Sequence, residues 1–326
     1  MSIRIKNKVF NLIKNKYIIF SSFYGKICFL QICLSIKIFN ALMSKHKRRK
    51  KYMNPILNIA IRAIRTGGKV LAQDYDLKDI THNSEKKNIL NYIKAIRKKI
   101  FLTIDTIIHR SYPHHAVINI FSKKKNTLSH RQWFINPLSG AVNFIKKIPH
   151  FCLSLLIKEK NQAYISVIYD PIKNDLFTAI RGQGAQLNGV RTRCCENNSF
   201  SHNKIIAIYF KNKNKKNTYL YVSLLQYFLQ EKVSFRQTGC SLLDLAYLSS
   251  GKINIYLGFN ERELHIIFGE LQIRESGGLI TDFLGGHNYI KSKLILIGHP
   301  GILKFFLKKT RKIHDIYENH GCVNKN

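Results

Sequence analysis

Acidic residues are scarce in this 326-residue chain, in which 18 Asp and Glu stand against 54 Lys and Arg and give a formal net charge of +36. Such a charge points to RNA, DNA or an acidic partner surface, because clustered Lys and Arg release counterions from phosphates. The alternative is compositional drift, since the excess is spread along the whole chain. We favour drift as the cause of the total charge, so the charge alone assigns no function.

Cysteine patterns that would mark a metal-binding or secreted protein are also missing. The seven cysteines show neither zinc-finger spacing nor a disulfide framework, and the adjacent Cys194 and Cys195 are badly placed to bridge to each other. The sequence therefore predicts a reducing, cytoplasmic location. With 45% hydrophobic residues, the chain can bury the core of one large domain or two small ones.

Residues 1–52 contain no acid and thirteen Lys or Arg. Residues 17–43 are apolar enough for a signal anchor, but Lys26 and Lys37 interrupt them and no small-residue cleavage site follows. Three interpretations stay open: a membrane anchor, a disordered basic tail, and a segment upstream of a true start at Met53. We favour the last two, so residues 1–52 are expected to be a basic extension.

Apolar periodicity predicts a mixed α/β chain. Helical spacing predicts a first helix over residues 55–75 and a second over about 88–112, which ends before Pro113. Further helices are expected at 219–231 and 241–248. Alternation and turn residues predict strands at 116–118, 132–135, 163–169, 176–180 and 253–258. The tail from Lys308 is expected to fray.

Residues 133–144, WFINPLSGAVNF, have the form of a site-building unit. The pattern predicts a strand that ends at Asn136, a turn through Ser139, and a helix that begins near Ala141, which would point backbone N–H groups at an anion. The Asn136 side chain is expected to cap this turn. The predicted anion-binding turn consists of Gly140, Ala141, Val142 and Asn143.

This stretch resembles the motif Trp-x-Ile-Asp-Pro-Leu-Asp-Gly-Thr-x-Asn-Phe of the inositol monophosphatase family, and is similar to its bacterial SuhB branch. The resemblance runs in order and spacing over about residues 53–312 and includes the segment 181–189, RGQGAQLNG. It implies a layered α-β-α-β-α sandwich with subdomains of about 53–190 and 191–312, followed by a basic tail, 313–326. It also implies a homodimer, since dimers are common in the family.

In the family, carboxylates, a Leu carbonyl and a Thr hydroxyl hold Mg²⁺ and activate a metal-bound water. Here the corresponding metal-site positions are Phe121, Asn136, Leu138, Ser139 and His265, and the water-activating position is Ala141. No Asp or Glu occurs between Asn88 and Thr103 either, where the family carries the acids of its third metal position. Neutral oxygens are weak Mg²⁺ ligands and imidazole prefers softer metals, so we predict no bound metal and no catalytic residue.

The resemblance implies a Nus-type factor in ribosomal RNA transcription antitermination and ribosome biogenesis, which joins RNA polymerase and NusA. The missing ligands favour this role over catalysis, and the basic surface would serve contacts with RNA. The alternative is a Mg²⁺-dependent phosphatase of inositol 1-phosphate or a similar sugar phosphate, with Glu261 or Glu263 as substitute ligands. A decaying gene product is a third interpretation.

Overall fold

The computed structural model describes residues 54–77, 86–121, 129–194, 204–211, 215–231, 233–261 and 263–321. The chain divides into a unit of Met1–Met53 and a unit of Asn54–Asn326, and all described helices and strands belong to the second. The expected basic extension and the candidate signal anchor lie outside the described residues. Within the described ranges, no helix combines the length and hydropathy that a bilayer span requires.

The first sheet has seven strands in the described part of the chain, and they follow one another in chain order. Its first pair is parallel, and all later neighbours are antiparallel. The strands are β1 (Ala116–Asn119), β2 (Arg131–Ser139), β3 (Cys152–Glu159), β4 (Gln162–Asp170), β5 (Asp175–Ile180), β6 (Gly184–Leu187) and β7 (Val190–Thr192).

The second sheet, again within the described ranges, has five strands in the order β11-β12-β10-β8-β9. Strand β8 pairs in parallel with β9 and β10, whereas β12 is antiparallel to β10 and β11. The strands are β8 (Ile205–Phe210), β9 (Ser234–Arg236), β10 (Ile255–Phe259), β11 (Leu279–Thr281) and β12 (Leu294–Gly298).

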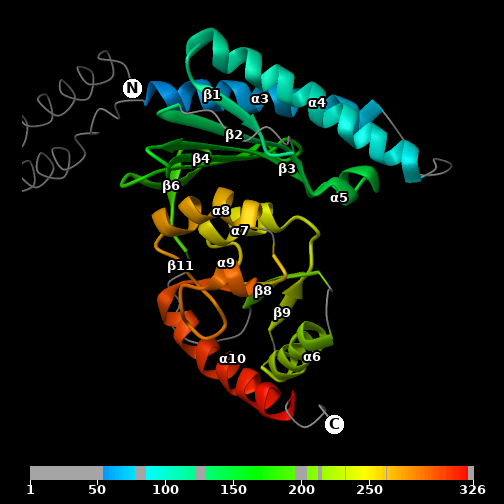
Figure 1. Cartoon of the computed structure of the whole chain (residues 1–326), viewed down its shortest axis with the longest axis vertical. Coiled ribbons are helices and arrows are strands. Elements are labelled where there is room, and N and C mark those ends of the chain that lie inside the picture. The colour runs from blue at the N-terminus through cyan, green and yellow to red at the C-terminus, as the bar shows by residue number, and fades with distance from the viewer. Residues whose placement is uncertain are drawn as a thin grey trace, which may run out of the picture. The chain divides into compact units, whose positions relative to one another are not determined.

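Helices and sheets alternate in five layers (Figure 1). The first sheet carries α3 (Pro55–Leu77) and α4 (Lys86–Ser111) on its outer face. Between the two sheets lie α7 (Ser241–Ser249) and α8 (Glu263–Glu275). The last layer consists of α6 (Lys215–Gln230) and α10 (Pro300–Gly321), and the short helices are α5 (Ala141–Ile145) and α9 (Tyr289–Ser292). The α-β-α-β-α sandwich implied by the resemblance is confirmed.

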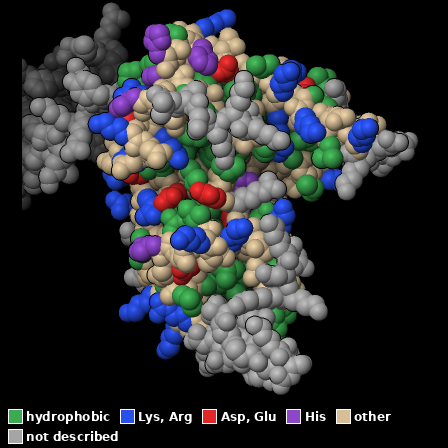
Figure 2. All heavy atoms as spheres, in the orientation of Figure 1, with side chains coloured by type: hydrophobic (Ala, Val, Ile, Leu, Met, Phe, Trp, Pro, Cys, Tyr) green, Lys and Arg blue, Asp and Glu red, His purple; other side chains and the backbone are tan. Residues whose placement is uncertain are grey.

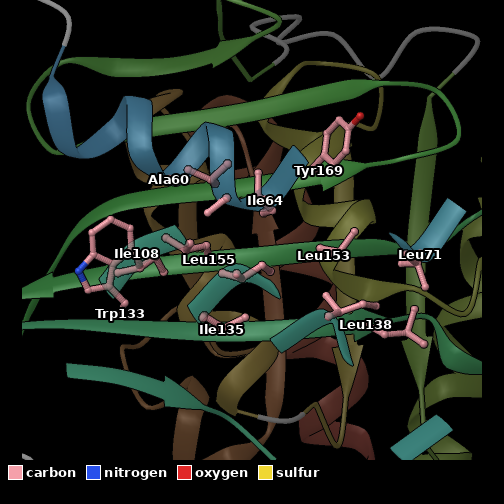
Figure 3. Close-up of a cluster of buried hydrophobic side chains, with 14 of the residues drawn as sticks. Ala60, Ile64, Leu71, Ile108, Trp133, Ile135, Leu138, Leu153, Leu155 and Tyr169 are labelled. Atoms are coloured by element: carbon pink, nitrogen blue, oxygen red, sulfur yellow. The ribbon is translucent and has the colours of Figure 1, made fainter. Parts of the chain in front are cut away.

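The core under the outer helices follows from the apolar periodicity of α3 and the alternation of β2 and β3. Figure 3 shows Ala60 and Ile64 of α3 above Trp133 of β2 and Leu155 of β3, all of them fully buried. Close approach also requires a glycine in α3: a Cβ on Gly68 would lie 2.5 Å from the Tyr169 ring. This core fixes the sheet edge from which the candidate site is built.

Two expectations about chain segments are corrected. Strand β2 does not end at Asn136 but continues to Ser139. Its register with β3 shifts between these two residues. The proline within this irregular stretch therefore loses no ladder hydrogen bond, and the strand can continue past it. The tail does not fray from Lys308, since α10 runs to Gly321. Thr310 anchors it, being buried with its Oγ1 donating to the Phe283 carbonyl at 2.9 Å.

Candidate functional site

The turn from β2 into α5 has the backbone that the motif predicted. Gly140 adopts a φ of 80°, and a Cβ there would lie 3.0 Å from the His150 carbonyl oxygen and 3.1 Å from the Cys240 Cβ. Only glycine fits both this left-handed conformation and this close approach. The helix that follows has five residues, too few to supply a strong dipole, and the anion-binding turn stays a prediction.

The two polar side chains at the acid positions of the motif are buried. Ser139 is 7% exposed and accepts a contact from the Cys240 thiol at 3.6 Å. Asn136 is 1% exposed, and its Oδ1 finds no hydrogen-bond partner among the described residues. The expectation that Asn136 caps the turn is therefore wrong, because its Oδ1 accepts no hydrogen bond from any described residue and the N-cap of α5 is Gly140.

Arg97 reaches the site from α4. It lies on the same stripe as the buried Ile93, Ile100 and Ile104, one or two turns away along the helix, so its side chain points toward the sheet. Its Nη2 donates to the Leu138 carbonyl at 3.2 Å. A guanidinium in an apolar stripe needs such partners, because burying an uncompensated charge is costly.

The second partner of Arg97 is Phe121, which follows β1. The guanidinium carbon lies 3.9 Å from the centroid of the Phe121 ring, within the range of a cation–π contact. Arg97 therefore contacts two of the five expected metal-site positions, Phe121 and Leu138. The sequence analysis missed this residue, although an arginine at helical spacing within an apolar stripe was a visible signal.

His265 lies in the first turn of α8. Its Nδ1 is 2.8 Å from the Oε1 of Glu261 and 3.1 Å from the Ser241 hydroxyl. The second carboxylate oxygen of Glu261 accepts a hydrogen bond from the Tyr256 hydroxyl. Burial and the Glu261 charge raise the pKa of Tyr256 well above its usual range, which keeps it a hydrogen-bond donor.

A second buried polar group surrounds the start of α7. Asp244 accepts from the Thr238 hydroxyl at 2.7 Å, and its Oδ1 lies 3.5 Å from the His150 Nε2, the distance of an ion pair. Asn143 links this group to the motif, because its Nδ2 donates to the His150 and Thr238 carbonyls, both at 2.7 Å. Burial raises the pKa of Asp244. Sequence reasoning assigned no role to Asp244 or Thr238, and it named Asn143 only as part of the predicted anion-binding turn.

A continuous series of contacts joins the expected metal-site positions. Arg97 links Phe121 to Leu138, and the next residue, Ser139, meets Cys240 at the N-cap of α7. The neighbour of Cys240, Ser241, contacts His265. The Cys240 sulfur also lies 3.8 Å from that of Cys152 on β3. A series of contacts thus connects Phe121, Leu138, Ser139 and His265, and Asn136 lies on the same strand as Leu138 and Ser139.

These residues do not fit a divalent metal. The side chains at the four acid positions carry no formal negative charge, and the Leu138 carbonyl that would complete the set already accepts from Arg97. A guanidinium a few ångström from a divalent cation repels it by several kcal/mol, on the order expected at an effective dielectric constant of about 20. In the described part of the chain, no group of three or more His, Cys, Asp or Glu side chains could hold a metal ion.

Comparisons with known proteins agree on one family. A model of the inositol monophosphatase family matches residues 52–315. The "Nus factor SuhB" of Escherichia coli (strain K12) is 39% identical to this chain, with 79% of this chain and 97% of that protein covered. The protein of the same name from Buchnera aphidicola subsp. Schizaphis graminum is 45% identical, with coverage of 71% and 85%.

Solved structures give the same result for the fold. The native extragenic suppressor protein suhB from Bartonella henselae superposes with a TM-score of 0.68 at 25% identity, with 79% of this chain and 99% of that one covered. An IMPase from Thermotoga maritima gives a TM-score of 0.67 at 21% identity, with coverage of 81% and 100%. This second likeness concerns the fold alone.

Proposed function

The chain belongs to the inositol monophosphatase family, and on this premise we propose that it is a Nus-type factor in ribosomal RNA transcription antitermination and ribosome biogenesis, with a degenerate catalytic site. The relatives named Nus factor SuhB support the first part, since they are 39% and 45% identical over most of their length. The observation that carries the second part is the placement of Arg97 on Phe121 and Leu138.

A scaffold role needs a rigid surface rather than a metal site, and the contacts outside the site support that role. The turn between β5 and β6 is held by Glu275, whose carboxylate oxygens accept from the Gly182 N–H at 2.7 Å and the Gly184 N–H at 2.8 Å. RNA polymerase and NusA are the proposed partners, and we place the protein in the cytoplasm with them. A homodimer remains part of this proposal.

Contact with RNA is proposed for a basic cleft beside this turn. Figure 2 shows that Lys and Arg side chains are spread over the displayed face, so total charge does not mark a site. Two cavities of about 350 and 230 Å³ share Arg274 and Glu275 in their linings. Their basic lining residues are Lys158, Arg181, Arg191, Arg193 and Arg274.

The lining of this cleft carries five Lys or Arg side chains against two Glu, and this excess of positive charge supports binding of an anion there. Glu275 accepts the two turn N–H groups, and Glu270 pairs with the Arg274 Nε at 2.8 Å. Arginine guanidinium groups match phosphate oxygens with planar pairs of donors. The cleft is therefore suited to the phosphate backbone of single-stranded RNA.

The phosphatase alternative has little support in the geometry of its two substitute ligands. Glu261 uses Oε1 on His265 and Oε2 on Tyr256, so coordinating a metal would break a buried hydrogen bond. Glu263 lies exposed in the first turn of α8. We therefore expect no hydrolysis of inositol 1-phosphate by the full chain over a Mg²⁺ titration, and saturable Mg²⁺-dependent hydrolysis would overturn the proposed loss of catalysis.

Capture of purified RNA polymerase and of NusA by the full chain at low salt tests the scaffold role. We expect both to be retained, with retention lost when the chain is unfolded beforehand. A folded chain that retains neither protein would contradict the proposed function. The same result together with a low unfolding free energy would favour the decaying gene product.

A further inference from the structure

We propose that the guanidinium of Arg97 is the resident cation of this site, where it takes the place of a divalent metal and closes the site to Mg²⁺. The inference rests on the proposed loss of catalysis and explains how the site stays folded without ions. It concerns three positions that come from separate elements: Arg97 on α4, Phe121 after β1 and Leu138 on β2.

Both partners of Arg97 are suited to a guanidinium rather than to a metal ion. A phenyl ring offers its negatively polarised face to a flat, weakly hydrated cation, as Phe121 does at 3.9 Å. A hard divalent ion instead requires oxygen ligands in fixed geometry. The Leu138 carbonyl can serve either cation, but it already accepts the Arg97 Nη2 at 3.2 Å.

The side chains next to Arg97 are compatible with a guanidinium in place of a divalent metal. Asn136 and Ser139 are buried and neutral, so they neither attract a metal nor require a counter-charge. Had they been carboxylates, a fixed guanidinium would pair with them and lower their affinity for metal ions. One charge on an invariantly protonated side chain therefore replaces an ion whose occupancy depends on its concentration.

Metal binding to the unmodified full chain is the first test. We expect no stoichiometric Mn²⁺ by electron paramagnetic resonance titration, and a Tm that differs by less than about 1 °C between EDTA and 10 mM Mg²⁺, because a ligand shifts Tm only by binding the folded state. One or more tightly bound Mn²⁺ per chain, or a Tm that rises by several degrees with Mg²⁺, would overturn the proposal.

A pair of acid-restored chains is the second test. Phe121→Glu, Asn136→Asp and Ser139→Asp are combined once with Arg97 retained and once with Arg97→Gln. We expect Mn²⁺ to bind at least about 10-fold more tightly in the chain with Arg97→Gln, since repulsion between the two cations is removed. Equal Mn²⁺ affinities of the two chains would contradict the proposal.

Single variants decide the question if the restored chains do not fold. Arg97→Gln should lower Tm by about 3 °C or more, whereas Lys98→Gln, at an exposed position of the same helix, should leave it unchanged. Equal Tm values for these two variants would overturn the proposal. Capture of RNA polymerase is measured separately, so its failure with unchanged metal results would count against the proposed function alone.

Discussion

The site around Ser139 and the turn held by Glu275 differ in how their polar side chains are paired. At the turn, both Glu275 oxygens accept backbone N–H groups. At the other end of the same two strands, the Asn188 Oδ1 accepts the Leu176 N–H at 2.8 Å. At the site, the Oδ1 of the buried Asn136 has no hydrogen-bond partner among the described residues.

This difference separates two uses of polar residues in one fold. A group that satisfies the backbone contributes to stability directly, since its removal leaves buried donors or acceptors unpaired. A buried polar group without a hydrogen-bond partner can be replaced by an apolar group of similar size at little cost. Stability measurements should therefore distinguish the two regions more clearly than the sequence does.

The largest expected effect comes from two buried asparagines that flank the same turn. Asn143→Leu should lower the free energy of unfolding by about 3 kcal/mol, because it leaves the His150 and Thr238 carbonyls without their donor. Asn136→Leu should change it by less than about 1 kcal/mol, because an apolar group replaces an amide whose oxygen is unpaired within the described residues. Urea unfolding of both variants measures the difference.

Both variants replace a buried asparagine with leucine, at Asn143 (5% exposed) and at Asn136 (1% exposed). The change in side-chain volume is therefore the same in both. Similar losses for the two would contradict the prediction that an asparagine with an unpaired oxygen contributes less to stability than one that satisfies two backbone carbonyls.

A smaller loss is expected at the turn itself. Glu275→Ala should cost about 2 kcal/mol, because two backbone N–H groups lose a charged acceptor and one of these hydrogen bonds is half-buried. Glu275→Gln keeps one oxygen and should cost less. Glu263→Ala, at an exposed position of the same helix, is the control and should cost at most about 0.5 kcal/mol. A loss for Glu275→Ala no larger than that of the control would contradict the prediction.

The third prediction tests whether the basic cleft beside the Glu275 turn binds RNA. Arg191→Gln with Arg193→Gln should weaken binding of a fluorescein-labelled 20-nucleotide single-stranded RNA about 10-fold. The slope of log affinity against log salt should fall by about 1.4, because two phosphate contacts are lost. Fluorescence anisotropy over a salt series measures both quantities.

The control for the cleft removes the same charge from α10 with Lys304→Gln and Lys308→Gln, both at exposed positions. We expect less than a twofold change in affinity. Equal weakening by the two pairs would mean that RNA responds to net charge alone, and the assignment of the cleft would be wrong.

Local pattern predicted the elements well but not the contacts of the site. The helix expected at 55–75 is α3, and the strands expected at 163–169 and 176–180 form the hairpin of β4 and β5. These follow from periodicity within a few residues. The resemblance added the positions Phe121, Asn136, Ser139 and His265, but it could not say which side chains lie around them.

What escaped the sequence analysis was long-range pairing. Arg97 meets Leu138 across 41 residues, and His150 meets Asp244 from a different element of the fold. Helical spacing shows that Arg97 shares a face with Ile93 and Ile100, yet it cannot identify the carbonyl and the ring that receive the charge. The packing of the layers determines which residues become such partners. A single sequence does not reveal that packing.

The smallest expected effect is a pH dependence of the free energy of unfolding, which arises from His150 near the site and not from the Glu275 turn. Burial alone would lower the pKa of His150, but its contact with Asp244 and the nearby Cys240 outweighs burial and raises the pKa above 6.5. A pKa that is higher in the folded than in the unfolded chain adds stability below about pH 6.5, which is lost as the pH rises through the folded-state value. The free energy of unfolding should therefore fall by less than about 1 kcal/mol between pH 6 and pH 8.

Nuclear magnetic resonance titration of the His150 ring protons, with urea unfolding at both pH values, checks this expectation. Asp244→Asn removes the carboxylate and should bring the pKa of His150 down, which flattens the pH dependence. Glu275→Ala should lower stability equally at both pH values, because the turn holds no group of the His150 pair. A His150 pKa at or below 6.5 in the unmodified chain would show that burial outweighs the Asp244 contact, and that this part of the site contributes to stability as an uncharged network.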